Sequence, residues 1–243
     1  MRNFFEINRN QTIQYGMLEL TPYAIIDDFF SNPDDVITLL HHVAPNFHKE
    51  SGNSNASLNQ YEGPPEEDRS HIKNYNGEHF KDMRHEFYSD MILPAYEHLF
   101  HVLKYMGVTQ IPMDRRAVLT NCFTFKKHPF NDFENNYWWP HRDHGYSALV
   151  YLNHNDNTGT NVYKCLADSY EDGVREHEQP WRPKERYEKI MNFEPAFNRC
   201  ILFDAGKYHH GMHVENWRFE DTPENDTRMN LGFFFHPAPK KSK

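Results

Sequence analysis

The sequence predicts a single α+β domain in which N-terminal helices support a jelly-roll-like antiparallel barrel. Two observations predict this class. Amphipathic helical spacing is confined to the first half of the chain, and short β-rich runs dominate the second half. The 243 residues are enough for one sizeable core, and no repeat or linker divides them. We therefore expect one domain over 1–243, with helical support mainly at 30–107 and barrel strands mainly at 115–236.

The first half of the chain contains a predicted strand and two predicted helical stretches. The strand is Tyr23–Asp27, and a helix is expected to begin within Ser31–Asp35, which places a proline and two carboxylates in the first turn. Large apolar residues recur with helical spacing over Phe80–Met106. Pro94 is expected to break this stretch into two pieces, and Gly107 is expected to end it.

The second half is rich in β-branched and aromatic residues grouped in short runs, which is typical of strands. Strands are expected at Ala117–Phe125, Tyr146–Leu152, Asn161–Tyr163, Arg199–Phe203 and Arg228–Phe235. The charged stretch from Asp168 to Trp181 has the composition of an insertion between strands. Strands that follow one another in this way favour an antiparallel sheet.

Composition excludes several classes of partner. A formal net charge of -9 disfavours phosphate backbones and anionic membranes, so neither nucleic acid nor membrane is expected as a partner. The three cysteines form no C-x-x-C pair, which argues against a disulfide framework and fits a reducing compartment. No apolar run has the length of a signal peptide or a membrane span. We therefore expect a cytoplasmic protein.

The segment Pro140–His144 contains an H-x-D pair, His141 and Asp143. In an extended segment, residues two apart point to the same face, so these two side chains can bind one metal ion. A histidine from a distant strand would complete the two-histidine, one-carboxylate arrangement of non-haem iron(II) oxygenases. Three protein ligands leave three positions of an octahedral ion open for other groups.

Context selects this pair among several that match the same pattern. Chance matches are common because the chain has 17 histidines and 35 acidic residues. The other matches are His48/Glu50, His154/Asp156 and His213/Glu215. Only His141/Asp143 directly precedes a convincing strand and is followed, further along, by both a histidine-bearing strand end and Arg228 on a strand. We therefore take it as the candidate metal pair.

Four further segments match a known family. They are Ile25–Phe30, Leu149–Asn153, Thr158–Thr160 and Asn198–Asp204. Together with the order H-x-D, strand, small-residue turn, distal histidine and strand-borne arginine, they resemble the Fe(II)/2-oxoglutarate-dependent oxygenases, and particularly the prolyl-4-hydroxylase-like branch. The resemblance implies a double-stranded β-helix, Fe(II) as cofactor and 2-oxoglutarate as co-substrate. It also implies hydroxylation of a protein side chain or a small molecule.

The resemblance implies the metal ligands as well. His141 and Asp143 correspond to the first two. His209 is the preferred third ligand because it lies six residues past Phe203, the spacing expected from the family. His210 and His213 remain alternatives, and His210 would point to the opposite face from His209 if the segment is extended.

A co-substrate site is implied around Arg228, which corresponds to the residue that binds the far carboxylate of 2-oxoglutarate. A guanidinium suits this role because its planar, permanently charged fork matches a carboxylate. Asn230 shares its face of the strand. Tyr151 and Asn121 are polar members of apolar strands and are candidates for lining the same pocket.

Other functions fit parts of the pattern. A cupin-type metal-binding barrel without 2-oxoglutarate chemistry would not need Arg228. A non-catalytic structural or interaction domain would not need an intact His141/Asp143 pair. A zinc hydrolase is disfavoured because no general base stands out near that pair. The sequence therefore favours the oxygenase, with a small molecule or a protein as substrate.

Overall fold

The computed structural model describes residues 4–42, 81–87, 92–109, 117–123, 134–138, 140–154, 159–166, 181–213 and 228–235. The helices are α1 (Pro33–His42), α3 (Leu93–Tyr105) and the 3-10 helix η4 (Lys184–Arg186). The first strands are β1 (Thr12–Leu18), β2 (Thr21–Asp27), β3 (Lys81–Phe87), β4 (Ala117–Phe123), β5 (Asn136–Trp138) and β6 (Tyr146–Tyr151). The later strands are β7 (Thr160–Cys165), β8 (Trp181–Pro183), β9 (Tyr187–Phe193), β10 (Cys200–Asp204), β11 (His209–Met212) and β12 (Arg228–Phe235).

These strands form three sheets. A seven-stranded sheet has the order β1-β2-β10-β6-β12-β4-β3, a three-stranded sheet the order β11-β7-β9, and β5 and β8 form a two-stranded ribbon. All strand pairs recorded between the described residues are antiparallel. The structure therefore consists mostly of antiparallel sheets with few helices, in agreement with the predicted class. The described residues do not form a closed barrel.

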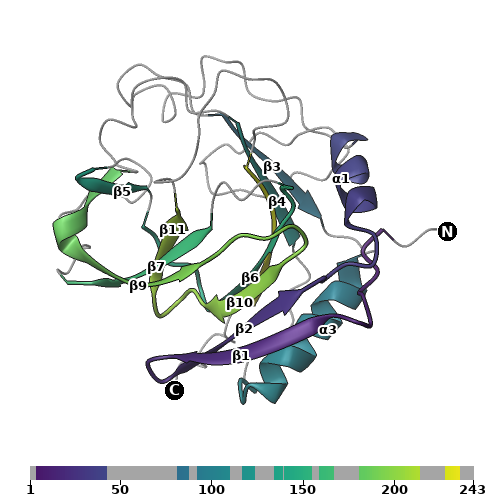
Figure 1. The fold of residues 1–243 in the computed structure, drawn as a ribbon, viewed down its shortest axis with the longest axis horizontal. Coiled ribbons are helices and arrows are strands. Elements are labelled where there is room, and N and C mark those ends of the chain that lie inside the picture. The colour runs from purple at the N-terminus through teal and green to yellow at the C-terminus, as the bar shows by residue number, and fades with distance from the viewer. Residues whose placement is uncertain are drawn as a thin grey trace, which may run out of the picture.

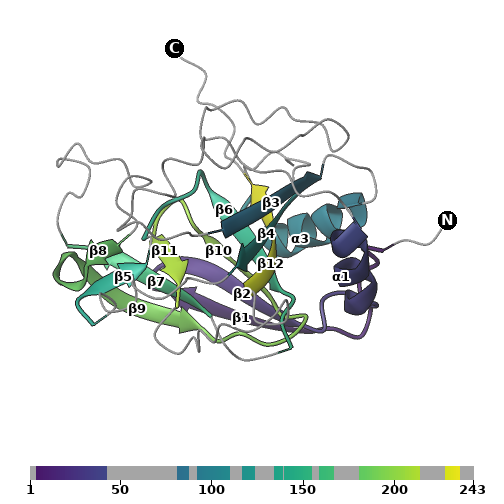
Figure 2. The same cartoon turned by 90° about the horizontal axis from the view of Figure 1, so that it is seen from above.

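The seven-stranded sheet lies between α3 and the three-stranded sheet (Figures 1 and 2). Side chains alternate along its strands, so each strand contributes to two hydrophobic layers. Cys200 and Leu202 of β10 pack in the layer under α3, whereas Ile201 and Phe203 pack with Val162 of the three-stranded sheet. The buried face of α3 consists of Ala95, Tyr96, Leu99, Val102 and Leu103. This alternation distributes the apolar residues of β10 between the two layers.

One predicted helical stretch needs correction. The second part of Phe80–Met106 is α3, with Pro94 in its first turn, and Gly107 follows its end with φ of 84°. The first part is the strand β3, which pairs with β4 along its whole length. Charged residues at Asp82, Arg84 and Glu86 alternate with other residue types. This two-residue period was obscured by apolar residues that also recur at helical spacing.

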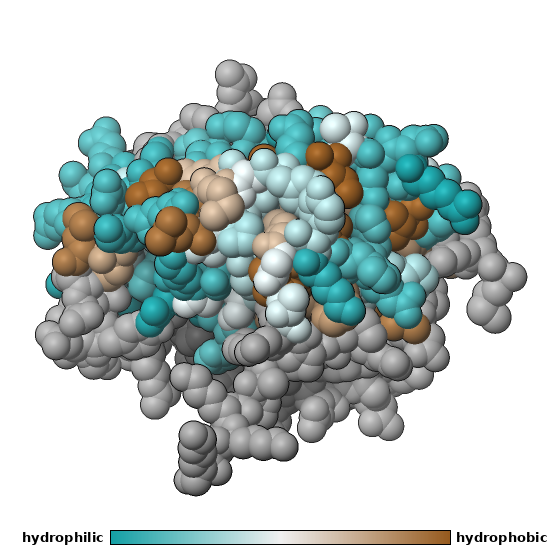
Figure 3. Space-filling model, turned by 90° about the horizontal axis from the view of Figure 1, so that it is seen from below, coloured by the Kyte–Doolittle hydropathy of each residue, from teal (hydrophilic) through white to brown (hydrophobic). Residues whose placement is uncertain are grey.

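Exposed apolar side chains are scattered over the described surface. The large ones are Tyr15, Met17, Leu20, Tyr105 and Leu166. Figure 3 views the molecule from the side of β1 and shows separate hydrophobic residues among hydrophilic ones. Single exposed apolar residues are normal for a protein surface. Among the described residues, none of the helices combines the length and the apolar character required to cross a membrane.

Asn198 joins the ends of β2, β6 and β10. Its side chain accepts a hydrogen bond from Phe30 N at 2.9 Å and donates one to Phe30 O at 2.9 Å. Its backbone N–H donates to Tyr151 O at 2.8 Å. Its φ of 61° lies in the left-handed region, which asparagine tolerates better than most residues. Asn198 thus fixes the strand that carries Tyr151.

Replacing Asn198 with alanine is expected to lower the free energy of unfolding by about 3 kcal/mol. The variant leaves two buried backbone groups of Phe30 without partners and puts alanine, which tolerates the left-handed region less well than asparagine, at this φ. Urea unfolding monitored by circular dichroism measures this loss. Asn198→Gly is the matched control, because it removes the same hydrogen bonds without the conformational cost. A glycine variant as unstable as the alanine variant would contradict the backbone part of this account.

Candidate metal centre

A short backbone bridge brings His141 and His210 together. His141 N donates to His210 O at 3.0 Å, and His210 N donates to His141 O at 2.8 Å. His141 follows the ribbon strand β5, whereas His210 belongs to β11. Residues directly opposite each other in an antiparallel pair present their side chains on the same face. The two imidazole centroids are accordingly 4.3 Å apart.

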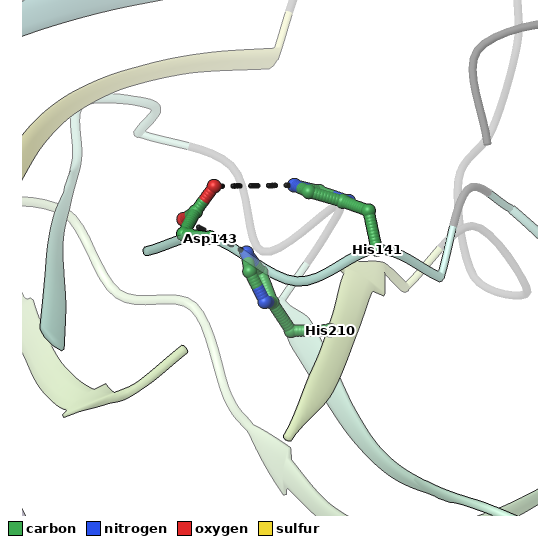
Figure 4. Close-up of side chains that lie close together, drawn as sticks. All are labelled: His141, Asp143 and His210. Carbon is green, nitrogen blue, oxygen red and sulfur yellow. Dashed lines mark ion pairs between the residues drawn. The ribbon is translucent and has the colours of Figure 1, made fainter. Parts of the chain in front are cut away.

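Asp143 completes the cluster. It lies two residues after His141, and its backbone N–H donates to Ala205 O at 3.0 Å. Its Oδ1 is 4.0 Å from His141 Nε2, and its Oδ2 is 3.4 Å from His210 Nε2 (Figure 4). One ligand atom from each residue lies within 4.8 Å of the other two. The arrangement offers a metal ion two imidazoles and one carboxylate.

His209 does not belong to this cluster, although the sequence-based choice of third ligand was His209. It is paired with Tyr163 across β11 and β7, so its side chain lies on the face of the strand opposite to that of His210. Its ring lies 5.5 Å from that of Tyr187. Burial lowers the pKa of His209 to about 4, and the positive charges of Arg142, His210 and Arg182 add to this effect. The structure therefore places His210, the second choice, beside His141 and Asp143.

The remaining alternative, His213, is also outside the cluster. Its backbone N–H donates to Gly159 O at 3.1 Å. Its Nδ1 is 3.0 Å from Asn192 Nδ2, which also donates to Asn161 Oδ1 at 2.6 Å. His213 is thus part of a polar network at the end of the three-stranded sheet.

The surroundings of Asp143 keep its carboxyl group ionised. Burial raises its pKa, but this effect is outweighed by the hydrogen bond and charge of His210, the charge of His141 and the hydrogen bond from Ser147. The net result holds the pKa of Asp143 well below its usual range. Ser147 Oγ donates to Asp143 Oδ2 at 2.8 Å, which fixes the orientation of the carboxylate. Sequence reasoning missed Ser147, although it lies on the strand that follows the metal pair.

The turn after β10 positions the segment around Asp143. Gly206 N donates to Gly145 O at 2.7 Å, and Gly145 has φ of 111°. A Cβ on Gly206 would lie 2.6 Å from Gly145 N and 3.4 Å from Asp143 O. Only glycine at position 206 therefore allows the two backbones to approach this closely.

Gly206→Ala is expected to weaken metal binding by roughly tenfold, the scale seen when groups that orient metal ligands are disturbed. The added methyl group would push the backbone at positions 143–145 away from the turn. Calorimetric titration with iron(II) measures the effect. Gly107→Ala is the control, since a Cβ at Gly107 meets nothing within 4 Å while its φ of 84° makes the substitution strained. It should lower stability while leaving the iron affinity unchanged, and equal losses in both variants would contradict this prediction.

Two of the predicted co-substrate residues lie on the face of the seven-stranded sheet that carries Ser147. Asn230 of β12 pairs with Tyr151 of β6, and both are buried. Met229 and Leu231 belong to the layer under α3, so Asn230 faces the three-stranded sheet. Tyr151 packs in the layer between the two sheets, and its hydroxyl donates to Thr160 Oγ1 at 2.7 Å.

The other two predicted residues, Arg228 and Asn121, are placed by backbone register alone, because the structure describes their backbone but not their side chains. Arg228 pairs with Cys122 and stands two positions before Asn230 on β12. Asn121 pairs with Met229, a residue of the layer under α3. The register therefore aligns Arg228, but not Asn121, with the inner position of Asn230.

Comparisons with known proteins yield only distant similarities. No protein-family model matches the sequence, and no curated protein matches it. Among solved structures, the chain is similar to a Pseudomonas putida prolyl-4-hydroxylase, with 13% identity, a TM-score of 0.37 and coverage of 66% of this chain and 74% of that chain.

Two further solved structures are similar at a comparable level. Prolyl 4-hydroxylases from Phytophthora capsici give 12% identity and a TM-score of 0.44, over 89% of this chain and 59% of that chain. A bsmA homolog from Methylobium petroleophilum gives 12% identity and a TM-score of 0.40, over 89% of each chain. Two of the three structures are named as prolyl 4-hydroxylases.

Proposed function

We propose that this protein is an Fe(II)- and 2-oxoglutarate-dependent dioxygenase that hydroxylates a protein side chain or a small molecule. The observation that carries the proposal is the cluster of His141, Asp143 and His210, whose ligand atoms lie within 4.8 Å of one another. Two imidazoles and one carboxylate with open positions are the ligand set of non-haem iron(II) oxygenases. The proposed third ligand is His210 rather than His209.

The geometry of the cluster fits an octahedral ion. Ligand atoms at right angles on metal bonds of about 2.1 Å lie roughly 3 Å apart. Asp143 Oδ2 lies 3.4 Å from His210 Nε2, Asp143 Oδ1 lies 4.0 Å from His141 Nε2, and one ligand atom from each of the three residues lies within 4.8 Å of the others, so the side chains would move closer together on binding an ion. Among the described residues, no further histidine, cysteine or carboxylate joins the group. Positions therefore remain open for a chelating 2-oxo acid and dioxygen.

The chain's own groups have distinct roles in this proposal. Asp143 supplies the negative charge that holds iron(II), and Ser147 keeps its carboxylate oriented. Arg228 and Asn230 are proposed to bind the far carboxylate of 2-oxoglutarate, with Tyr151 lining the same pocket. Asn121 is left out of this pocket because of its register with Met229. When bound, iron and 2-oxoglutarate supply the oxidative decarboxylation to succinate that drives oxidation of a substrate C–H bond.

The finer features of the fold belong to the same proposal. The seven-stranded and three-stranded sheets enclose a common hydrophobic layer, as expected for the two faces of a double-stranded β-helix. We propose that the whole chain forms one such domain and that it acts in the cytoplasm. Its partners are then a small-molecule or protein substrate, rather than nucleic acid or a membrane.

Anaerobic titration of the metal-free protein with iron(II) and 2-oxoglutarate tests the proposal. A weak visible charge-transfer band is expected only when both are present. Admission of oxygen should then yield succinate, slowly even without substrate. Asp143→Ala should abolish both signals, because two neutral imidazoles hold iron(II) poorly without a carboxylate. Iron binding without a band or succinate would instead favour a metal-binding barrel that does not use 2-oxoglutarate.

A further inference from the structure

A second polar layer lies on the side of the three-stranded sheet that faces away from the metal cluster. His209 and Tyr163 are paired across β11 and β7, so both point to the face opposite His210 and Val162. The ribbon β5-β8 lies against this face, with the ring of Tyr137 4.4 Å from that of Tyr163. Figure 2 shows the ribbon beside β7 and β11. This layer is separate from the hydrophobic layer between the two larger sheets.

Arg182 belongs to this layer. Its register pairs it with Tyr137 across the ribbon, so the two side chains share the side of the ribbon that meets the three-stranded sheet. Arg182 is only 3% exposed. Its buried Nε has no hydrogen-bond partner within the described part of the chain, and no ion pair there involves it. A buried guanidinium without an anion is costly, and among the described residues the charge of Arg182 is not balanced.

A second basic side chain lies close to this layer. Lys184 Nζ lies 5.3 Å from the ring of Tyr137. The tyrosine and histidine side chains of the layer carry no negative charge at neutral pH. The described residues therefore place the buried guanidinium of Arg182 beside a second basic side chain.

We propose that this layer, which we call the Arg182 site, binds an oxyanion in the form of a carboxylate or phosphate group. The guanidinium fork of Arg182 receives two oxygens of the anion, and the anion supplies the missing negative charge. The ribbon strand β5 leads directly into His141, so the Arg182 site adjoins the metal cluster while β11 separates the two. A ligand with an acidic group can occupy it without touching the metal. Anion binding at this site does not depend on iron or 2-oxoglutarate.

Equilibrium dialysis with radiolabelled inorganic phosphate tests the Arg182 site. The protein is kept in a chelator so that phosphate cannot bind through a metal ion. We expect one saturable phosphate per chain, and displacement by acetate if the site also accepts carboxylates. Arg182→Gln should weaken phosphate binding at least about tenfold, since a charged hydrogen-bond pair is lost. Arg186→Gln, which changes an arginine of the neighbouring helix η4, should bind phosphate as the unmodified protein does.

Two outcomes would overturn the proposal: no saturable binding of phosphate or acetate, or unchanged binding in folded Arg182→Gln protein. Should Arg182→Gln fail to fold by circular dichroism, Arg182→Lys replaces it, because the lysine keeps the charge but lacks the fork. Crystals of the unmodified protein soaked in bromide give a readout that needs no variant. An anomalous peak beside the Arg182 guanidinium is expected, and its absence would refute the site.

Discussion

Replacing His210 with alanine is expected to abolish iron(II) binding, whereas replacing His209 with alanine should leave most of it intact. His210 Nε2 lies 3.4 Å from Asp143 Oδ2, while His209 lies on the opposite face of β11. The loss in His210→Ala should exceed the roughly 10–100-fold effects produced by groups that only orient ligands. Calorimetric titration with iron(II) under anaerobic conditions measures both variants.

Each of these two alanine variants serves as the control for the other. Both histidines are buried members of the same strand, and each is 5% exposed, so general destabilisation should affect the two variants similarly. Circular dichroism and thermal unfolding establish that each variant folds. Loss of iron binding in His209→Ala, with retention in His210→Ala, would return the assignment to the residue chosen from the sequence.

Arg228→Ala is expected to weaken 2-oxoglutarate binding at least about tenfold and to leave iron(II) binding nearly unchanged. The expected loss follows from removal of a hydrogen-bonded charge, which contributes about 1.5–3 kcal/mol. The backbone of Arg228 stands two positions before the buried Asn230, on the strand that pairs with β6. The charge-transfer band, titrated with 2-oxoglutarate at saturating iron, reports the affinity.

Arg228→Lys is the matched variant for this prediction. Lysine keeps a positive charge at the same position but lacks the planar fork, so an intermediate affinity for 2-oxoglutarate is expected. Equal 2-oxoglutarate affinity in all three proteins would remove Arg228 from the co-substrate site. Because iron affinity is measured separately, the metal assignment would survive such a result.

The metal pair could be predicted because it depends on local geometry. A spacing of two residues places His141 and Asp143 on one side of an extended segment, and the structure brings them together. The same rule predicted that His209 and His210 point to opposite faces. It could not show which one lies beside His141 and Asp143, because the face of β11 is set by the bridge between His210 and His141. That bridge joins distant parts of the chain and leaves no local signal.

Strands could be predicted where both faces are buried, and were missed where one face is polar. β10 and β12 are rich in apolar residues, so their composition indicated a strand. β1 is largely exposed, and β9 carries charged residues at Glu188 and Lys189. β1 forms by pairing with β2, the next strand in the sequence, and β9 forms by pairing with β7, which lies further away in the sequence. Neither pairing can be read from the composition of the strand alone. The burial of Arg182 was equally invisible in the sequence.

The backbone bridge between His141 and His210 also has a consequence for the order of events during maturation of the protein. Two peptide hydrogen bonds join the segments that carry these ligands. Under the proposed function, backbone pairing brings the two histidines together without help from the ion, so folding of the site does not require iron. Iron that binds only the folded chain would still add to its stability, by an amount that grows with the free iron concentration.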